Sequence, residues 1–467
     1  MKRLLAALFV LALFTAACGD DSGGDDADEG TTTSAAPVDN DDASDDSTTD
    51  DDSTTDDDST TDDDSPVDDV APFASFQGVS ETEIGFGVAA IDAEALIPFG
   101  VDLGTAPVEE MYIAWSDAQN ERGGVLGRNL VPTTRLFLPV GTAPSDAVCA
   151  EFAEDLELFT VIGQFLGDAP LCITQLNGLP YIGHFGLNDS RDEASEGRFI
   201  ATEMANSAQR YGGVAEMIAQ GDLDGKKVAL WWGNPVDAEF ADLVRPLLEE
   251  ANIEITAEVE VGDFGQDQVA ADLAGDQRME VVKSSGADFI LSLSNINPVA
   301  EAADRNRFDG TIGFTNGQAA DQIIFPEAEI AEDSTVPERT FAITTDKPTP
   351  EQALADAGIQ QCIDEYNAAY SDPIDLESKT TVQALVNHCR AFRLMVLIFE
   401  SAGVDLTPET FVAGAEALGT FDLPAMADAT LGPDNHAAGS KIRRYEYDAS
   451  VGYHLPVGDA IDPVVPA

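Results

Sequence analysis

From about residue 79 to residue 344, short apolar strand patterns alternate with amphipathic helical patterns. The expected strands cover residues 83–88, 130–138, 160–163, 179–183, 227–232, 253–259, 289–293, 311–315 and 340–344. The expected helices cover residues 108–120, 145–158, 170–176, 206–220 with Asn206 as a cap, 238–251 and 269–285. Alternation of this kind is typical of βαβ units, which form parallel sheets covered by helices. The fold class is therefore predicted to be α/β.

The length of the chain indicates two lobes. About 390 of the 467 residues follow the first 77, which is too many for a single hydrophobic core. The last third begins with two long helical patterns at 350–370 and 379–402 and ends with a strand pattern at 441–447, where the chain can cross between lobes. We predict two doubly wound parallel-sheet lobes joined by a hinge. The N-terminal lobe comprises 78–205 and 346–430, and the C-terminal lobe comprises 206–345 and 431–467.

The first residues have the pattern of an export signal. Lys2 and Arg3 precede an apolar stretch at 4–14, and a run of small residues ends in Cys18. Eleven apolar residues are too few to span a bilayer, which needs about 20 in a helix, so residues 1–17 are predicted to be a cleaved signal peptide. The residues around Cys18 resemble a bacterial lipobox, whose cysteine receives a lipid. The predicted location is extracytoplasmic, anchored to the bacterial cell membrane by that lipid; the alternative is an ordinary signal peptide.

Residues 18–77 are predicted to form a disordered acidic tether. This segment repeats Asp-Asp-Asp-Ser-Thr-Thr and contains too few apolar residues to bury a face. A calcium-binding role is the alternative, but the repeat lacks the Gly and Glu of the calcium loop pattern.

The formal net charge of the chain is −64, from 23 basic and 87 acidic residues, which argues against a nucleic-acid partner. The acidic residues of the chain after the tether are interpreted as a solvated surface. The alternative is an electrostatic funnel for a cationic ligand.

Four cysteines remain after Cys18. An even number outside the cytoplasm indicates two disulfides, and of three connectivities the sequence-local one is favoured, with Cys149–Cys172 and Cys362–Cys389. The cysteine and histidine spacings do not match a zinc site, so no metal is expected. No phosphate-loop, dinucleotide-binding, nucleophile-elbow or zinc-protease motif is present. We therefore expect no cofactor and no enzymatic activity.

The segment Asn120-Glu-Arg-Gly-Gly-Val-Leu-Gly-Arg128-Asn-Leu130 resembles a motif of the type I periplasmic binding proteins, the leucine/isoleucine/valine-binding family. In that family the motif joins the first helix to the second strand. Cys149 and Cys172 also match positions where family members carry a disulfide. The resemblance extends loosely over residues 79–346. It implies a monomer with two lobes that captures a small-molecule ligand and delivers it to the permease of an ABC transporter.

Open parallel sheets bind ligands at the carboxyl ends of their strands, which gives a set of candidate ligand-binding residues. They are Phe165, Leu166, His184, Phe185, Gly186, Trp232, Asn234, Val236, Ser294, Asn295, Asn316 and Gln318. Each has a structural alternative. Adjacent strand residues face opposite sides, so either Trp231 or Trp232 lines the cleft, while His184 is either a ligand contact or a hydrogen-bonded loop residue. The two phenylalanines either pack within the lobe or stack on the ligand.

The chain departs from the family at the expected amino-acid clamp. Amino-acid-binding members carry Ser and Thr in the loops after strands three and four, with aromatic and acidic residues in the second lobe. Here the corresponding loops are Gln164-Phe-Leu-Gly-Asp168 and His184-Phe-Gly-Leu187, while Asn316 stands near the expected acid. This favours a bulkier, more apolar ligand, or one rich in amide or aromatic groups.

Three functions follow from these observations. The first is a lipid-anchored solute-binding protein that delivers an amino acid, amide or related compound to an ABC importer permease. The second is a ligand-sensing or interaction ectodomain on the same fold. The third is a cell-surface enzyme, which requires a nucleophile or metal cluster that the sequence does not indicate.

Overall fold

The computed structural model of the chain describes residues 71–95, 106–139, 143–165, 167–184, 186–233, 237–262, 268–294, 299–317, 320, 330–331 and 333–465. The predicted signal peptide, the lipidation site at Cys18 and most of the predicted tether lie outside these residues. The last residues of the predicted tether are held against the body. The Ser75 hydroxyl donates to the Leu406 carbonyl at 2.8 Å, and the Gln77 amide donates to the Leu158 carbonyl at 3.2 Å. The packed body therefore begins before Val79.

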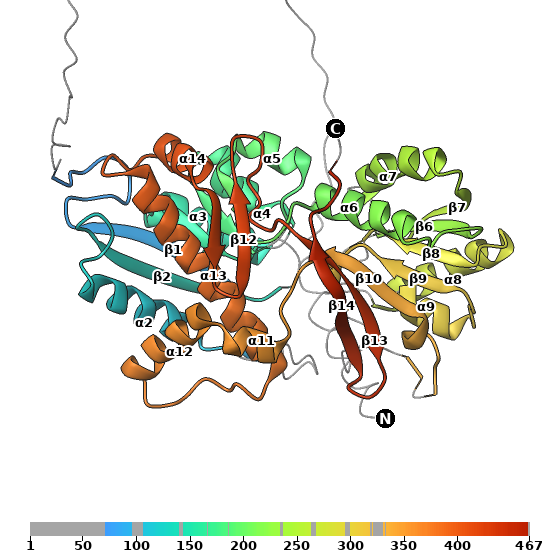
Figure 1. The fold of residues 1–467 in the computed structure, drawn as a ribbon. Helices are drawn as coiled ribbons and strands as arrows, with labels where there is room; N and C mark the ends of the chain where they lie inside the picture. Colours follow the sequence, from blue (N-terminus) through green and yellow to red (C-terminus); the bar gives the residue numbers. More distant parts are fainter. Residues whose placement is uncertain are drawn as a thin grey trace, which may run out of the picture. The chain divides into compact units, whose positions relative to one another are not determined.

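The first lobe contains a five-stranded parallel sheet in the order β2-β1-β3-β4-β5 (Figure 1). Its strands are β1 (Glu83–Ile91), β2 (Asn129–Phe137), β3 (Thr160–Gly163), β4 (Tyr181–Gly183) and β5 (Phe199–Ala201). The helices that follow these strands are α2 (Val108–Glu121), α3 (Ala143–Ala150), α4 (Ala169–Leu171) and α5 (Asp189–Ser195), with π-helical turns η3 (Glu151–Asp155) and η4 (Cys172–Leu176). Later segments of the chain add α11 (Pro350–Ala355), α12 (Ala357–Ala369), α13 (Lys379–Ala402), α14 (Pro408–Ala417) and the hairpin of β11 (Gly419–Leu423) and β12 (Met426–Leu431).

Alternate residues of β1 face two different cores. Phe86 and Val88 belong to the core made with α2, α12 and α13, whereas Ala89 belongs to the core made with α3. This alternation follows from strand geometry, in which successive side chains point to opposite faces. Helix α13 is long and apolar enough to cross a membrane, but 72% of its most apolar window is buried inside the lobe. It is therefore the central helix of this lobe.

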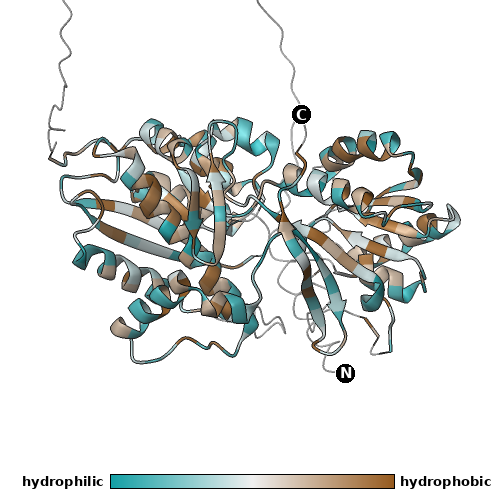
Figure 2. Cartoon of the chain, viewed as in Figure 1, coloured by the Kyte–Doolittle hydropathy of each residue, from teal (hydrophilic) through white to brown (hydrophobic). Residues whose placement is uncertain are grey.

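The second lobe contains a seven-stranded sheet in the order β14-β13-β10-β9-β8-β6-β7. The parallel strands are β6 (Lys227–Trp232), β7 (Glu254–Glu260), β8 (Phe289–Ser292), β9 (Thr311–Phe314) and β10 (Thr340–Thr345). Their helices are α6 (Asn206–Ala219), α7 (Ala238–Glu250), α8 (Gln268–Ser284), α9 (Val299–Arg305) and the short 3₁₀ helix η7 (Pro337–Arg339). Two antiparallel strands from the end of the chain, β13 (Ile442–Asp448) and β14 (Tyr453–Ile461), complete the sheet beside β10 (Figure 1). Hydrophobic residues concentrate in the strands of both sheets (Figure 2).

Three connections pass between the two lobes, at residues 202–205, 346–349 and 432–441. They lie side by side. Ala201 forms a parallel bridge with Ala437, and the backbone N–H of Asp346 donates to the Lys441 carbonyl at 2.8 Å.

The glycine motif after α2 shapes the entry of the chain into lobe one. Gly124 has a φ of 71°, and a Cβ there would lie 2.0 Å from the Arg128 carbonyl oxygen, so only glycine fits. Val125 is fully buried, whereas Leu126 forms part of the turn with a φ of 52°. Arg128 is also buried, and its Nη2 donates to the carbonyls of Phe73 and Val404 at 2.7 and 2.8 Å. The motif therefore anchors the segment that enters the lobe.

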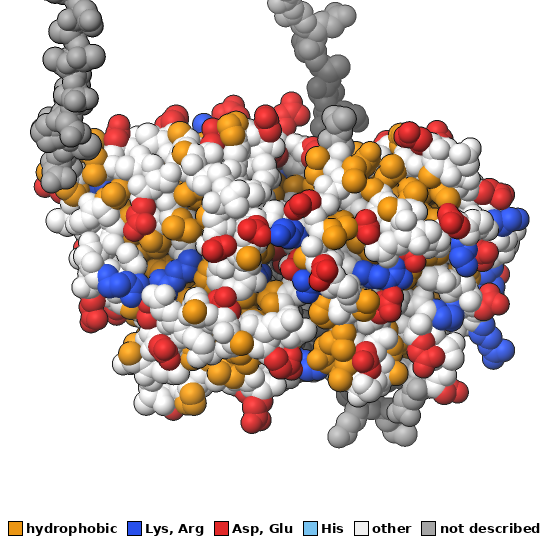
Figure 3. Space-filling model, viewed as in Figure 1, with side chains coloured by type: hydrophobic (Ala, Val, Ile, Leu, Met, Phe, Trp, Pro, Cys, Tyr) orange, Lys and Arg blue, Asp and Glu red, His pale blue; other side chains and the backbone are white. Residues whose placement is uncertain are grey.

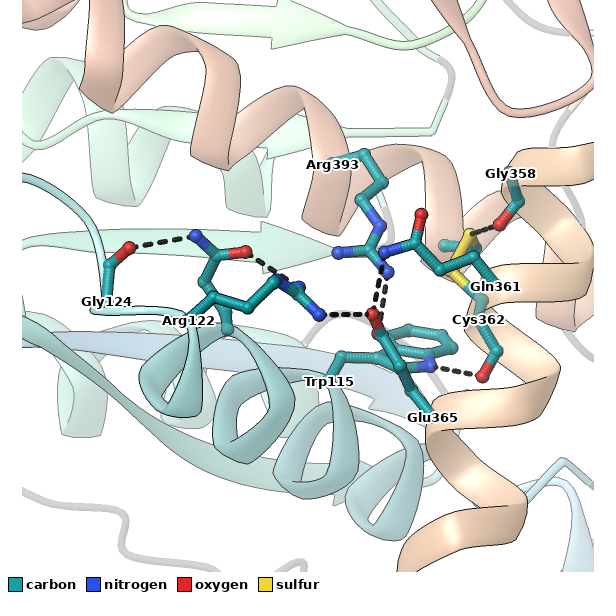
Figure 4. Close-up of polar contacts among 10 residues, drawn as sticks. Trp115, Arg122, Gly124, Gly358, Gln361, Cys362, Glu365 and Arg393 are labelled. Atoms are coloured by element: carbon teal, nitrogen blue, oxygen red, sulfur yellow. Dashed lines mark hydrogen bonds and ion pairs between the residues drawn. A yellow bond between two sulfur atoms is a disulfide. The ribbon is translucent and has the colours of Figure 1, made fainter.

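Helices α2, α12 and α13 are joined by a polar cluster around Glu365 (Figure 4). The Glu365 carboxylate accepts from Arg122 at 2.8 Å and from Arg393 at 2.6 Å. The Trp115 indole N–H donates to the Cys362 carbonyl at 2.9 Å, on the neighbouring turn of α12. The cluster thus joins α2 to α12 and α13, which lie far from it in the sequence.

The structure contains the two sequence-local disulfides. Cys149 of α3 is joined to Cys172, and Cys362 of α12 is joined to Cys389 of α13. Both bridges connect neighbouring elements of the first lobe. Each closes a short loop, with sequence separations of 23 and 27 residues.

Several local expectations were wrong. Asn206 is the first residue of α6 and does not cap it, since the cap position is Ala205 and no side chain accepts from the helix N-terminus. The helix expected at 350–370 is two helices, because the Asp356 carboxylate accepts from the N–H groups of Gly358 and Ile359 and starts α12. The sequence analysis also missed α5, β5, α9, α14, β14 and the hairpin of β11 and β12. All of these except α14 and β14 are short.

Candidate functional site

The carboxyl ends of the strands were the expected location of the site. Six of the twelve predicted residues lie outside the described residues: Leu166, Phe185, Asn234, Val236, Asn295 and Gln318. The other six are Phe165, His184, Gly186, Trp232, Ser294 and Asn316. All of these except Gly186 are at least nine-tenths buried.

Phe165 and Trp232 lie within hydrophobic cores. The ring centroid of Phe165 lies 6.2 Å from that of Phe137 and 5.6 Å from that of Tyr181. Trp232 packs in the core formed with α6 and α7, whereas Trp231 points to the opposite face and packs with α8 and α9. Both tryptophans of β6 therefore act in packing within the described part of the lobe.

His184 is a buried residue with free hydrogen-bonding capacity. It is 3% exposed, and neither ring nitrogen has a partner among the residues that the structure describes. Its ring packs edge to face on the His388 ring, with 4.8 Å between the ring centroids. A hydrogen bond of 3.1 Å joins the His388 Nδ1 to the Tyr112 hydroxyl. Burial lowers the pKa of His184 well below its ordinary value, and the nearby His388 and Arg390 lower it further. His184 is thus a neutral imidazole at pH 7.

The loops after β3 and β4 are tied together by one arginine. Arg191 Nη1 donates to the Gly186 carbonyl at 2.6 Å, and Nη2 donates to the Gly167 carbonyl and the Asp168 carboxylate, both at 2.9 Å. Gly186 has a φ of 96°, a conformation that favours glycine. These loops are therefore positioned by the fold rather than by a ligand.

In the second lobe, side chains near the start of α6 form hydrogen bonds with residues at the ends of β8, β9 and β10. The Asn316 amide donates to the Gln209 Oε1 at 3.0 Å, and the Gln209 Nε2 donates to the Thr345 hydroxyl at 2.7 Å. Arg210 donates to the Leu293 carbonyl at 2.9 Å, next to the buried Ser294. Burial lowers the pKa of Arg210 to about 10. This network joins Asn316 to Gln209 and Thr345 inside the lobe.

A cavity lies between the two lobes beside the connections, with a volume of about 190 Å³. The first connection contributes Glu203, and the second contributes Lys347, Pro348 and Thr349. The second lobe contributes Gly317, Ala320, Ala342, Thr344, Tyr445, Tyr453, His454 and Pro456. The first lobe contributes Pro350, Ala353, Lys379, Thr380, Val382, Gln383, Val386, Asn387 and Arg390.

Of the six predicted residues that the structure describes, none lines this cavity, although Gly317 follows Asn316 directly in the chain. The sequence contained one usable signal: Arg390 is a charged residue inside an otherwise apolar helical pattern. A charge in such a position is rarely buried without a role. The contribution of β13 and β14 had no signal in the sequence, because the pairing of β13 with β10 and of β14 with β13 is a tertiary feature.

The cavity contains three cationic side chains and one carboxylate. Lys347 Nζ lies 3.7 Å from the Glu203 Oε1, and Lys379 Nζ lies 3.7 Å from the ring centroid of Tyr453. Arg390 is 3% exposed, and its Nε donates to the Pro424 carbonyl at 2.8 Å. Burial lowers the pKa of Arg390 to about 10, so it remains charged at pH 7. Burial lowers the pKa of His454 to about 4, so it is neutral at pH 7.

The positive lining contrasts with the rest of the molecule. On the face drawn in Figure 3, Asp and Glu side chains are spread over both lobes. A second cavity of about 270 Å³ lies beside the connections, but its charges are paired within the protein. Lys441 Nζ lies 2.6 Å from Asp428, and Arg443 Nε lies 3.1 Å from Asp346. We therefore take the first cavity as the candidate site.

The described residues contain no group of three or more His, Cys, Asp or Glu side chains able to hold a metal ion. The polar groups of the described lining are cations, amides, hydroxyls, the His454 imidazole and the Glu203 carboxylate. The arrangement can bind a small molecule through charge and apolar contact.

No family model matches the chain, and no curated protein matches it. Solved structures do resemble it. A solute-binding protein of an ABC transporter from R. palustris, in complex with 4-hydroxybenzoate, has 15% identity and a TM-score of 0.57, covering 82% of this chain and 97% of that one. A fatty acid ABC transporter substrate-binding protein from Thermomonospora curvata has 16% identity and a TM-score of 0.59, covering 83% and 94%.

A possible leucine/isoleucine/valine-binding protein from Rhodopirellula baltica has 13% identity and a TM-score of 0.56, covering 81% of this chain and 96% of that one. These likenesses establish that the chain has the type I periplasmic binding protein fold. At such identities they do not fix the ligand.

Proposed function

We propose that this protein is the solute receptor of an ABC importer, anchored outside the membrane by lipid on Cys18. The observation that carries the proposal is the cavity, whose walls come from both lobes and from two of the connections. A solute there contacts both lobes at once. The solved structures of similar fold are ABC transporter solute-binding proteins, which supports a role in transport.

Capture follows from the position of the cavity. A solute that contacts both lobes binds the closed arrangement more tightly than an open one, so it shifts the population toward closure. To move the equilibrium from 1:99 to 99:1, the two affinities must differ by about 5.5 kcal/mol. The closed form is then the one that the permease recognises.

A thermal-shift screen of the full chain tests capture. The panel starts from the solutes that the sequence favours, which are amino acids, amides and aromatic compounds, and adds polyamines and nucleosides. A solute at one hundred times its dissociation constant adds about 2.7 kcal/mol to the free energy of unfolding. We expect a reproducible rise in Tm of a few degrees with one class, whereas no rise with any solute contradicts capture.

Delivery is tested with a permease reconstituted in vesicles, taken from a gene beside that of this protein. The solute-loaded receptor is expected to stimulate ATP hydrolysis by the permease, while the unloaded receptor stimulates it less. Binding without stimulation contradicts delivery and favours the sensory ectodomain. The lipid anchor is tested separately by radioactive fatty acid labelling, which Cys18→Ser should abolish.

A further inference from the structure

The charge lining the cavity between the lobes is opposite in sign to that of the protein. The whole chain carries 87 acidic and 23 basic residues, yet the described residues that line the cavity include Lys347, Lys379 and Arg390 and a single carboxylate, Glu203. The charge of the described lining is therefore positive by two. Glu203 already interacts with Lys347 at 3.7 Å. A negative group on a solute would complement these cations.

The most buried of the three cations is held in a fixed position. Arg390 is 3% exposed, and its Nε donates to the Pro424 carbonyl at 2.8 Å while Nη2 donates to the Ala425 carbonyl at 2.5 Å. Carbonyl oxygens carry only partial negative charge, and the carboxylates of Glu203, Asp356 and Asp346 favour the charged guanidinium without forming an ion pair with it among the described residues. A buried charge is stabilised best by an opposite charge. A bound anion provides it at this place.

The remaining wall of the cavity is mostly apolar. Ala342, Val382, Val386, Tyr445 and Pro456 line it, and the Tyr453 ring is covered on one face by Lys379. Ligand sites of this composition fix an apolar body with a few polar groups. The volume of about 190 Å³ limits the size of that body. An apolar cavity of about 150 Å³ holds benzene, so this cavity has space for one ring and one small polar group.

The cavity also discriminates against a positive group on the solute. The one carboxylate among its described lining residues belongs to Glu203, and the histidine in its wall, His454, is neutral at pH 7 because burial lowers its pKa to about 4. An ammonium group would therefore meet three cations and compete with Lys347 for one carboxylate. An amino acid, which carries both charges, is disfavoured for the same reason.

We infer that the solute is a small monocarboxylate with a single ring or branched aliphatic body and no ammonium group. Its carboxylate faces Lys347, Lys379 and Arg390, and its body lies against the apolar wall. The inference rests on the proposed function, since it names the solute class for the same cavity.

The test is isothermal titration calorimetry of the full chain with four probes of similar size: benzoate, benzamide, benzylamine and leucine. We expect benzoate to bind with a one-to-one stoichiometry. Benzamide keeps the ring but lacks the charge, so its dissociation constant is expected to be at least about tenfold larger, as for loss of a charge-assisted hydrogen bond. Benzylamine and leucine are expected to bind more weakly than benzamide.

Variants locate the carboxylate. Lys347→Gln and Lys379→Gln are expected to weaken benzoate binding about three- to tenfold and to leave benzamide binding unchanged. Arg390 is not substituted in these variants, because its hydrogen bonds to the carbonyls of Pro424 and Ala425 support the fold. The matched control is Lys441→Gln, which removes a lysine from a neighbouring connection outside this cavity and should leave benzoate binding unchanged.

Each outcome is decisive. Equal or tighter binding of benzamide, benzylamine or leucine overturns the inference, and so does an effect of Lys441→Gln equal to that of Lys347→Gln. If carboxylates do not bind but another solute raises the Tm, the solute class is wrong and the proposed capture stands. If carboxylates and every other solute fail, the proposed function fails with it.

Discussion

Glu203 and Lys347 form an ion pair of 3.7 Å between two different connections of the lobes. Glu203 follows β5 and Lys347 follows β10, so the pair joins the chain where it leaves the first lobe to the chain where it returns. Both side chains also line the cavity. The pair therefore couples the relative position of the lobes to the charge of the side chains that line the cavity.

Substitution Glu203→Gln tests the charge of the cavity. The change removes the one carboxylate among the described lining residues, so a bound anion meets less repulsion and we expect benzoate to bind about two- to fivefold more tightly. The free energy of unfolding should change by less than about 1 kcal/mol, because the pair is partly exposed. Calorimetry and urea denaturation measure the two effects. Weaker benzoate binding in this variant would contradict a repulsive effect of Glu203 on the bound carboxylate.

The buried histidines make the protein sensitive to acid. Burial lowers the pKa values of His388 and His454 to about 4, and that of His184 lies well below its ordinary value. The unfolded chain binds protons near pH 6.5 whereas the folded chain does not, so stability is complete above about pH 6.5 and falls as the pH drops toward 4. The loss is about 3 kcal/mol for each of His388 and His454.

Urea denaturation at pH 7, 6, 5 and 4 measures this dependence, and His388→Gln identifies one source. The variant should be less stable than the parent at pH 7, because the hydrogen bond to Tyr112 is altered. Its stability should nevertheless fall less steeply below pH 6.5. A slope identical to that of the parent would contradict the buried neutral state of His388.

His436 is expected to have the opposite pH dependence. Its Nδ1 lies 2.7 Å from the Asp192 carboxylate, and that hydrogen bond raises its pKa above the ordinary value. The stabilisation is complete below about pH 6.5 and is lost as the pH rises through the folded pKa. His436→Gln should therefore cost about 1–3 kcal/mol at pH 5.5 and less at pH 8.5. Asp192→Asn is the matched variant, and an equal cost at both pH values argues against the pair.

Arg128 is predicted to hold the entry segment. Its guanidinium donates to the carbonyls of Phe73, Ser80 and Val404 from a fully buried position. Arg128→Ala leaves these carbonyls without a charged donor, so we expect a loss of about 3 kcal/mol and faster proteolysis near residues 71–80. Arg135→Ala is the control, because its pair with Glu151 is exposed and is worth less than about 1 kcal/mol. Equal effects of the two changes would refute the role of Arg128.

The alternation of short apolar runs with helical patterns was sufficient to predict the fold class, because period and length distinguish buried strands from helices. It was not sufficient for edges and breaks. Strand β5 has only three residues, and β14 contains Pro456 and Gly458, which weaken a strand pattern. The break at Asp356 depends on a side-chain cap inside a continuous helical pattern.

The candidate site was harder to predict than the fold. The rule that ligands bind at the carboxyl ends of strands selected His184 and Asn316, which lie near the connections. It also selected Phe165 and Trp232, which are core residues. The face toward which Trp232 points is set by its packing on α6 and α7, and sequence alternation alone leaves that choice open. The cavity combines α13 with β13 and β14, which lie far apart in the sequence and meet only through the tertiary fold.

The most direct test of solute capture is the distance between the lobes with and without a solute. Spin labels at Glu121→Cys on α2 and Glu249→Cys on α7 report on one lobe each, since both residues are exposed and the four native cysteines of the body are paired. Saturating benzoate, or whichever solute raises the Tm, should shift the inter-label distance by more than about 2 Å and narrow its distribution. A bound solute that leaves the distance distribution unchanged would contradict capture by lobe closure.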